Sequence, residues 1–203
     1  MASSRERVVT AAMRLFGERG YSSTTIAQIE AAAGLSPGAG GIYRHFPSKR
    51  AILETGVAAQ IDGQANLVAM IKDPGAPESL PLRDRLLVVA RASLRRLEQE
   101  QDLNRLVMRD LSQFPVLLDR VGREDIGPVF RAFAGWLRSE AVDEVDQDWD
   151  AIAMALMGAV THFWILGDIF GLHPAGIEED RYLAAVVSLA ECALTAAQGK
   201  GNR

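Results

Sequence analysis

Residues 25–49, with the sequence TIAQIEAAAGLSPGAGGIYRHFPSK, decide the fold that we expect for this 203-residue chain. Thr25 and Gln28 have the spacing of a capping box, in which the two side chains satisfy free N–H groups at a helix start. A glycine that can adopt positive φ then ends this helix. Ser36 followed by Pro37 is typical of the start of another helix. The stretch therefore predicts two helices joined by a tight turn, which is a helix-turn-helix.

Helices are also predicted on both sides of this stretch. A Ser-x-x-Glu capping box begins a helix over residues 3–19. Ser48 caps a long helix that continues to about Lys72, and a loop rich in Pro and Gly, residues 73–81, ends it. Beyond the loop the apolar pattern is helical throughout, without sustained strand-type alternation. The chain is therefore predicted to be all-α.

Two segments near the C-terminus, residues 151–171 and 178–198, are strongly apolar. A membrane span needs about twenty apolar residues, but Thr161, His162 and Asp168 oppose that interpretation for the first segment. One chain of this length would struggle to cover both helices, so they predict an interface with a second copy of the chain. The residues predicted for this dimer interface are Leu156, Met157, Val160, Leu183, Val186, Val187, Ala190 and Leu194.

One linked pattern resembles a known family. It runs Ala33-Gly34-Leu35-Ser36 … Ile42-Tyr43-x-His45-Phe46-x-Ser48-Lys49, and it is similar to the DNA-binding domain of TetR/AcrR bacterial transcriptional regulators. The resemblance covers roughly residues 5–53, and the spacing from the turn glycine to the tyrosine is about two residues longer here. It implies a three-helix DNA-binding domain over residues 1–50. A long helix would join this domain to a helical ligand-binding and dimerisation domain over 51–203, whose last two helices dimerise.

The charge distribution agrees with a protein that touches DNA with one end. The chain carries a formal net charge of −4, yet its first fifty residues hold more basic than acidic side chains. The basic residues are Arg5, Arg7, Arg14, Arg19, Arg44, Lys49 and Arg50, and the acidic ones are Glu6, Glu18 and Glu30. A basic end on an acidic body suits contact with phosphates at that end only.

The candidate DNA contacts fall into two classes, because phosphate contacts orient a protein and base-edge contacts supply sequence preference. The candidates for phosphate are Thr25, Tyr43, His45 and Lys49. The candidates for the major groove are Gln28, Ser36, Pro37, Gly38, Ala39, Gly40 and Arg44. Arg44 could read guanine with both N–H groups of its fork or bind a phosphate. Ile42 and Phe46 are expected in the core.

No set of residues for catalysis or metal binding is found. Residues 34–38 match the Gly-x-Ser-x-Gly nucleophile motif, but they follow a helix, and Pro37 has no N–H for an oxyanion. The three histidines have no metal-ligand partner three or four residues away. We therefore expect no enzyme, no cofactor and no metal. The single cysteine, Cys192, is expected to be buried, and the polar N-terminus lacks a signal peptide, which favours a cytoplasmic protein.

The middle helices of the C-terminal part are expected to form an apolar pocket. Its candidates are Met108, Leu111, Phe130, Phe133, Trp136, His162, Phe163 and Trp164, each of which could also be ordinary core. The leading hypothesis is a homodimeric repressor that an apolar or aromatic small molecule releases from a palindromic double-stranded DNA operator. The alternatives are an activator of the same architecture and a helical interaction protein whose helix-turn-helix no longer reads DNA.

Overall fold

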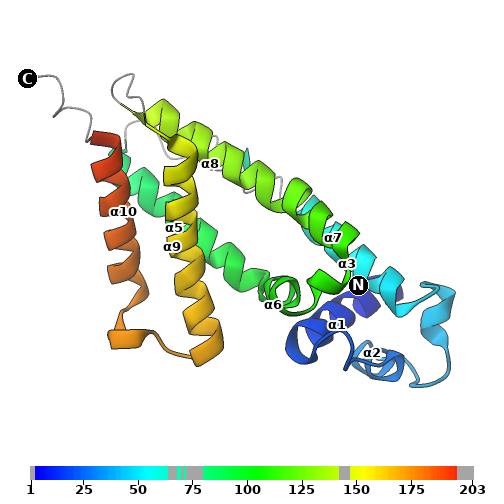
Figure 1. Ribbon diagram of the computed structural model, residues 1–203. Coiled ribbons are helices and arrows are strands. Elements are labelled where there is room, and N and C mark those ends of the chain that lie inside the picture. Colours follow the sequence, from blue (N-terminus) through cyan, green and yellow to red (C-terminus); the bar gives the residue numbers. More distant parts are fainter. Residues whose placement is uncertain (1–2, 64–67, 70, 72–79, 142–146, 196–203) are drawn as a thin grey trace, which may run out of the picture. The chain divides into compact units, whose positions relative to one another are not determined.

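The computed structural model describes residues 3–63, 68–69, 71, 80–141 and 147–195, and every regular element within these ranges is helical. The prediction of an all-α fold is confirmed. The chain forms two compact units. The N-terminal unit comprises Met1–Gln64 and Glu100–Asp125, and the C-terminal unit comprises Ala65–Gln99 and Ile126–Arg203. Figure 1 shows the helices of both units.

The N-terminal unit is built around α1. Its elements are α1 (Ser4–Arg19), α2 (Ile26–Ala32), the 3₁₀ helix η1 (Gly41–Arg44), α3 (Lys49–Asp62), α6 (Gln101–Arg109), η2 (Leu111–Gln113), α7 (Pro115–Arg120) and the π-helical η3 (Val121–Ile126), which ends at the unit boundary. The core of this unit includes the fully buried side chains of Val8, Phe16, Ile29, Ile42, Ile52, Leu53, Val57, Leu106 and Leu111. The predicted core positions Ile42 and Phe46 are both buried.

Two glycines allow the helices to approach α1 closely. A Cβ atom on Gly56 of α3 would lie 2.3 Å from the sulfur of Met13 in α1. A Cβ atom on Gly17 of α1 would lie 2.6 Å from the Cα of Asp102 in α6. Both distances are far below ordinary contact, so a side chain at either position would force its neighbour to move. That neighbour is backbone at Gly17 and the side chain of Met13 at Gly56.

The compact units divide the chain differently from the domains 1–50 and 51–203 expected from sequence. Ile52, Leu53 and Val57 of α3 are buried in the N-terminal core, so a boundary after residue 50 would cut through packed structure. Residues 100–125 also join this core, although they follow α5 (Leu82–Gln99) in sequence. Moreover, α3 ends at Asp62 and not at Lys72. Val68, Ala69 and Ile71 are helical, and the other residues of 64–72 lie outside the described residues.

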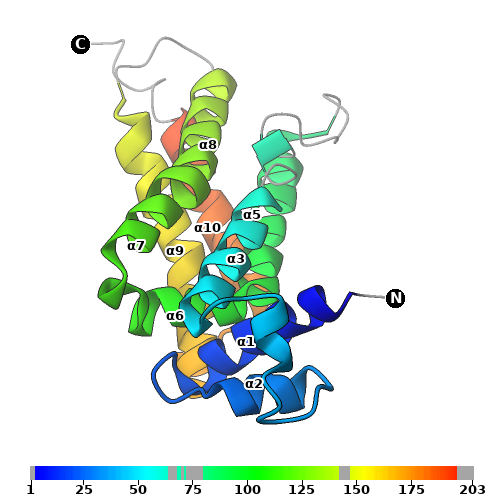
Figure 2. The ribbon, with the colours of Figure 1, turned by 90° about the vertical axis from the view of Figure 1, so that its right-hand side faces the viewer.

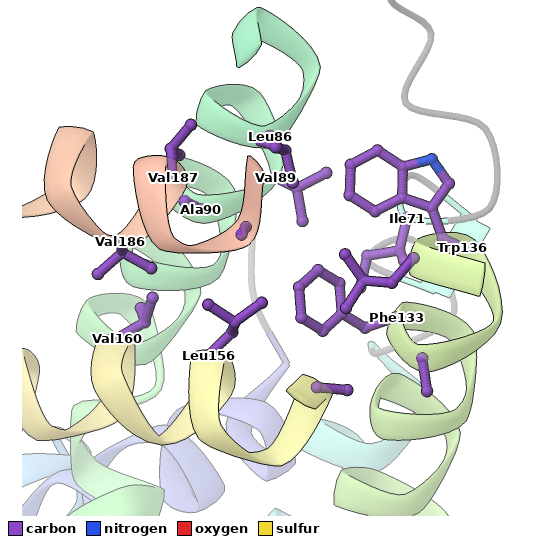
Figure 3. Packing of buried hydrophobic residues seen from close by; sticks show 14 of the residues in the cluster. Ile71, Leu86, Val89, Ala90, Phe133, Trp136, Leu156, Val160, Val186 and Val187 are labelled. Atoms are coloured by element: carbon purple, nitrogen blue, oxygen red, sulfur yellow. The ribbon is translucent and has the colours of Figure 1, made fainter. Parts of the chain in front are cut away.

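The C-terminal unit consists of α5 (Leu82–Gln99), α8 (Gly127–Glu140), α9 (Trp149–Phe170), the short η4 (Pro174–Gly176) and α10 (Glu179–Thr195). α9 packs against α5, α8 and α10, and Figure 2 gives a second view of these helices. Phe133 and Trp136 of α8 point toward aliphatic side chains of α5, α9 and α10 in Figure 3. Arg85 of α5 and Glu140 of α8 form a two-pronged ion pair at the edge of this core.

Helix α9 can be compared with a membrane span and with a core helix. Among the described residues it is the one helix long and apolar enough to cross a membrane, by length and composition only. Core helices of soluble proteins have the same properties. Ala153, Leu156, Val160, Phe163 and Trp164 form its buried side and lie in the core of the C-terminal unit. α9 therefore has one side packed within the chain and another that the chain leaves exposed.

Candidate nucleic-acid interface

Helix α2 begins and ends as the sequence predicts. The hydroxyl of Thr25 accepts a hydrogen bond from the N–H of Gln28 at 3.2 Å, and the Gln28 side chain accepts one from the N–H of Thr25 at 2.8 Å. At the other end, Gly34 has a φ of +72°. The N–H of Leu35 donates to the carbonyl of Glu30 at 2.8 Å, which completes a Schellman cap. Both ends of the first helix of the motif are thus fixed locally.

The segment after α2, residues 36–45, differs from the prediction and is called the turn segment below. No helix begins at Pro37. Instead, the N–H of Ala39 donates to the carbonyl of Ser36 at 3.3 Å, with Pro37 second in the turn and Gly38 third. Gly38 has a φ of +77°, as a type II turn requires. Gly40, with a φ of +68°, also leaves helical geometry, so the second helix shortens to η1.

A buried carboxylate, which no sequence motif singles out, holds the turn segment on α2. Glu30 is 0% exposed. Its Oε2 accepts a hydrogen bond from the N–H of Gly38 at 2.7 Å, and its Oε1 accepts a longer one from the N–H of Ile42 at 3.4 Å. Glu30 follows Ile29 on the buried side of α2, and an acid in that position was the signal that could have revealed it.

The predicted DNA contacts lie mainly on the surface of this unit. The exposed ones are Thr25, Ser36, Pro37, Gly38, Ala39, Tyr43, Arg44 and His45, and the partly exposed ones are Gln28, Gly40 and Lys49. Tyr43, with 58% exposure, projects from η1, as does the neighbouring Arg44. The turn segment thus presents small side chains before η1 and large polar ones on it. Thr25 and Gln28 use part of their hydrogen-bonding capacity within the capping box.

Lys49, predicted to bind phosphate, is already engaged within the unit. Its ammonium group donates to the carbonyl oxygens of Tyr21 and Thr24, both at 2.8 Å, and lies 4.2 Å from the centre of the Tyr21 ring. Burial lowers the pKa of Lys49 below its usual value. The ammonium group has three N–H donors, so one remains for a phosphate. Lys49 therefore ties the start of α3 to the connection between α1 and α2.

Two arginines of α1 that were counted only as charges also reach the motif. The guanidinium of Arg5 lies 5.0 Å from the centre of the ring of Phe46, the residue that follows the turn segment. The Nε of Arg7 donates to the carbonyl of Ala33 at 3.2 Å, at the C-terminus of α2. Both contacts join residues far apart in sequence, which no local pattern could have predicted. They bring positive charge to the helix-turn-helix.

The predicted ligand-binding residues are divided between the two units. Met108 is exposed and Leu111 buried in the N-terminal unit. Phe133, Trp136, Phe163 and Trp164 are buried in the C-terminal unit, where Phe130 is partly buried. His162 was expected in an apolar pocket but is exposed on α9. Nothing in the described residues gathers three His, Cys, Asp or Glu side chains as a metal site.

The residues predicted for the dimer interface are mostly buried within a single chain, and the interface itself stays a prediction. Leu156, Val160, Leu183, Val186, Val187, Ala190 and Leu194 belong to the core of the C-terminal unit, and Met157 packs against it. The other side of each helix is exposed: it carries Met154, Ala155, Gly158, His162 and Ile169 on α9, and Ala185, Leu189 and Cys192 on α10. The prediction that Cys192 is buried is wrong. The apolar periodicity predicted both helices, but the residues selected from it lie on the side of each helix that faces the core.

Comparison with known proteins defines the class to which this geometry belongs. Residues 8–55 match the family described as bacterial regulatory proteins, tetR family. The chain is 25% identical over 176 residues to the HTH-type transcriptional repressor BepR of Brucella suis biovar 1, covering 82% of this chain and 83% of that protein.

Solved structures share the fold over nearly the whole chain. A TetR-like transcriptional regulator from Rhodococcus sp. RHA1 aligns with a TM-score of 0.69 and 22% identity, covering 98% of both chains. A TetR transcriptional regulator from Legionella pneumophila aligns with a TM-score of 0.67 and 17% identity, covering 95% of this chain and 98% of that one. The protein is thus a DNA-binding transcriptional regulator with a helix-turn-helix, not an enzyme. Its DNA-binding part, residues 8–55, is that of the tetR family.

Proposed function

We propose that the protein is a homodimeric, cytoplasmic repressor that leaves a palindromic operator when an apolar or aromatic small molecule binds. The observation that carries this proposal is the exposed turn segment, anchored on α2 and flanked by Arg5 and Lys49. The similarity to a protein named as a repressor favours repression over activation. A reporter gene behind the bound promoter separates the two, since loss of the protein raises expression only for a repressor.

Dimerisation through the exposed sides of α9 and α10 accounts for the palindromic operator. Met154 on α9 and Leu189 on α10 are large apolar side chains with 61% and 65% exposure. Small residues beside them, Ala155 and Gly158 on α9, permit close helix packing. A two-fold axis would bury both helices of each copy in a four-helix interface. The same axis presents two helix-turn-helix motifs to two half-sites.

The effector is proposed to bind the C-terminal unit, whose core is rich in aromatic side chains. Phe133 and Trp136 lie with ring centres 6.1 Å apart, and Phe163 and Trp164 belong to the same core. Such an environment suits an apolar or aromatic ligand. Release from DNA requires that the ligand bind the non-DNA conformation better, and each ~1.4 kcal/mol of difference is tenfold in affinity.

The deciding experiment for the proposed function is a gel shift with the upstream region of the protein's own gene. We expect a shifted complex that survives an excess of scrambled duplex and weakens as salt rises. A footprint of the shifted fragment should show two symmetric half-sites. Equal competition by operator and scrambled duplex would instead support the interaction protein with a helix-turn-helix that no longer reads DNA.

A compound screen then tests the effector. Tryptophan fluorescence and release of the operator are followed together, because Trp136, Trp149 and Trp164 all belong to the core of the C-terminal unit and a ligand beside any of them alters its emission. We expect an apolar compound that changes both signals at the same concentration. A compound that saturates the fluorescence change and leaves operator affinity untouched would show a pocket without a switch.

A further inference from the structure

We propose that Glu30 is the positioning residue that gives the protein its sequence discrimination, by holding the turn segment in its DNA-reading conformation. The inference rests on the proposed function, binding of the turn segment to an operator. Glu30 lies on the buried side of α2 and has no exposed surface. A carboxylate in such a place is stable only when its oxygens are hydrogen-bonded. Here the donors are backbone N–H groups of the turn segment.

The two hydrogen bonds reach both ends of the glycine-rich connection. Gly38 is the third residue of the type II turn, and Ile42 is the second residue of η1. The residues between them are Ala39, Gly40 and Gly41. One side chain thereby fixes where the turn ends and where η1 begins. The spacing between the small residues before η1 and the large ones on it is set by this single group.

Apart from local hydrogen bonds of the Ala39 N–H to Ser36 and of the Tyr43 N–H to Gly40, little else in the described residues restrains the connection. A Cβ atom added to Gly38 or Gly41 would meet nothing within 4 Å. Glycine loses more backbone freedom on ordering than any other residue. A segment with glycine at three of these positions therefore populates many conformations unless a specific contact selects one. The contact that selects it is the Glu30 carboxylate, with Ile42 buried beside it.

DNA binding depends on the fraction of molecules in which the connection is ordered. Ser36 and Pro37 lie before the connection, and Tyr43 and Arg44 lie after it, all of them exposed. They can meet their sites on one duplex together only when the connection is ordered. Apparent affinity falls by the fraction of molecules in the binding-competent conformation. Contacts to phosphates outside the turn segment need no such order, so non-specific binding is expected to persist.

Replacement of Glu30 by glutamine is the most informative change. Glutamine has nearly the same shape, but only one of its two terminal atoms accepts a hydrogen bond. The amide group would face the N–H of Gly38 or of Ile42, and one of these contacts would be lost. A buried donor without a partner is costly, so we expect the preference for operator over scrambled duplex to fall about tenfold or more.

The matched control is Glu18→Gln. Glu18 lies in α1 of the same unit, is exposed and pairs with Arg14 at 3.4 Å. The two variants change the net charge equally, so they alter general attraction to DNA alike. Affinity for the operator fragment found by gel shift and for its scrambled form is measured by fluorescence anisotropy, with circular dichroism to verify folding. Loss of the operator preference in Glu30→Gln alone supports the proposal, and an unchanged preference overturns it.

The ratio of the two affinities separates positioning from mere stability. Partial unfolding would lower operator and scrambled affinities by the same factor, and that result would overturn the positioning role. If Glu30→Gln fails to fold, Gly38→Ala takes its place. This change strains a residue with a φ of +77° on the surface without touching the core, and we expect the same loss of preference. A wild-type preference in folded Gly38→Ala would overturn the proposal.

A measurement without DNA distinguishes failure of this inference from failure of the proposed function. The N–H of Gly38 should exchange slowly with solvent in the wild-type protein and in Glu18→Gln, and faster in Glu30→Gln. If the wild-type protein shows this protection but no operator preference, the proposed function fails and Glu30 keeps only its structural contact. If exchange at Gly38 is the same in both glutamine variants, Glu30 does not hold the turn segment.

Discussion

The carboxylate of Asp110, at the end of α6, accepts a hydrogen bond from the backbone N–H of Tyr21 at 3.2 Å, across 89 positions of sequence. Beside it, the Arg109 guanidinium donates to Asp110 at 3.0 Å and to the carbonyls of Phe16 and Gly17 in the last turn of α1. A cation and an acceptor from α6 thus complete the C-terminus of α1. The chain returns from α5 to stabilise the helix that supports the helix-turn-helix.

Asp110→Ala should destabilise the N-terminal unit. Asp110 is buried, and its removal leaves the N–H of Tyr21 without its acceptor and Arg109 without its carboxylate partner. We expect a loss of about 1–3 kcal/mol in the free energy of unfolding, measured with urea. Asp119→Ala, which removes an exposed carboxylate from α7 of the same unit, is the control and should cost under about 1 kcal/mol. Equal losses would show that the contact with Tyr21 contributes little.

Gly17→Ala tests the contact between α1 and α6 from the other side. The added methyl group would lie 2.6 Å from the Cα of Asp102, which is backbone and cannot turn away. α1 and α6 must then separate, and overpacking of this kind costs about 1–3 kcal/mol. Gly135→Ala in α8 is the matched change, because its methyl group would meet nothing within 4 Å. That variant should be more stable by about 0.5–1 kcal/mol in thermal or urea unfolding.

Local patterns explain what could be predicted from the sequence. The capping boxes of Ser3 with Glu6 and of Thr25 with Gln28, and the cap at Ser48, join groups three positions apart, so residue identity was enough. The predicted helix start at Ser36-Pro37 was wrong, because this pair can begin a helix or occupy a type II turn. The φ values of Gly38 and Gly40 and the acceptor on Glu30 decide for the turn. The Ser-Pro pattern alone does not reveal that acceptor, which lies on α2.

The C-terminal unit shows that sequence periodicity does not tell which side of an apolar helix faces the core. A helix such as α9, apolar on most sides, satisfies the periodicity of a core helix and of an interface helix at once. The sequence identified the helices, but only packing reveals that Leu156 and Val187 face the core and that Met154 and Leu189 remain exposed. A glutamate at Leu156 or Val187 would therefore bury a charge in the protomer core and destabilise the fold itself.

Leu189→Glu is the sharper test of dimerisation. Leu189 is exposed on α10, so the charge is tolerated in a single chain and is buried only if a partner covers this side. We expect a folded monomer in sedimentation at low micromolar concentration. Val116→Glu, at an apolar residue of the N-terminal unit with 78% exposure, is the control and should remain dimeric. A dimeric Leu189→Glu would place the interface elsewhere.

Lys49→Ala should weaken binding to all DNA sequences alike. Loss of one phosphate contact is expected to reduce the slope of log affinity against log salt by about 1. The same change removes two hydrogen bonds to the carbonyls of Tyr21 and Thr24, so stability must be measured in parallel. Lys49→Arg keeps the charge, and its salt slope should stay near that of the wild-type protein. If Lys49→Ala lowers stability but leaves the salt slope unchanged, Lys49 acts only within the protein.

Substitutions at Arg44 distinguish base reading from phosphate binding. It is exposed at the end of η1, next to Tyr43, and can either bind guanine with its two-pronged fork or contact a phosphate. If it reads guanine, Arg44→Ala should cost about 1–3 kcal/mol on the operator and relax the preference at one base pair per half-site. Arg44→Lys keeps the charge and loses the fork, so it should relax the same position while retaining the salt slope. Affinities for a set of duplexes with single base-pair changes measure both effects. A uniform loss over all duplexes in Arg44→Ala, restored by lysine, would assign Arg44 to the phosphate backbone and leave base reading to the small residues before η1.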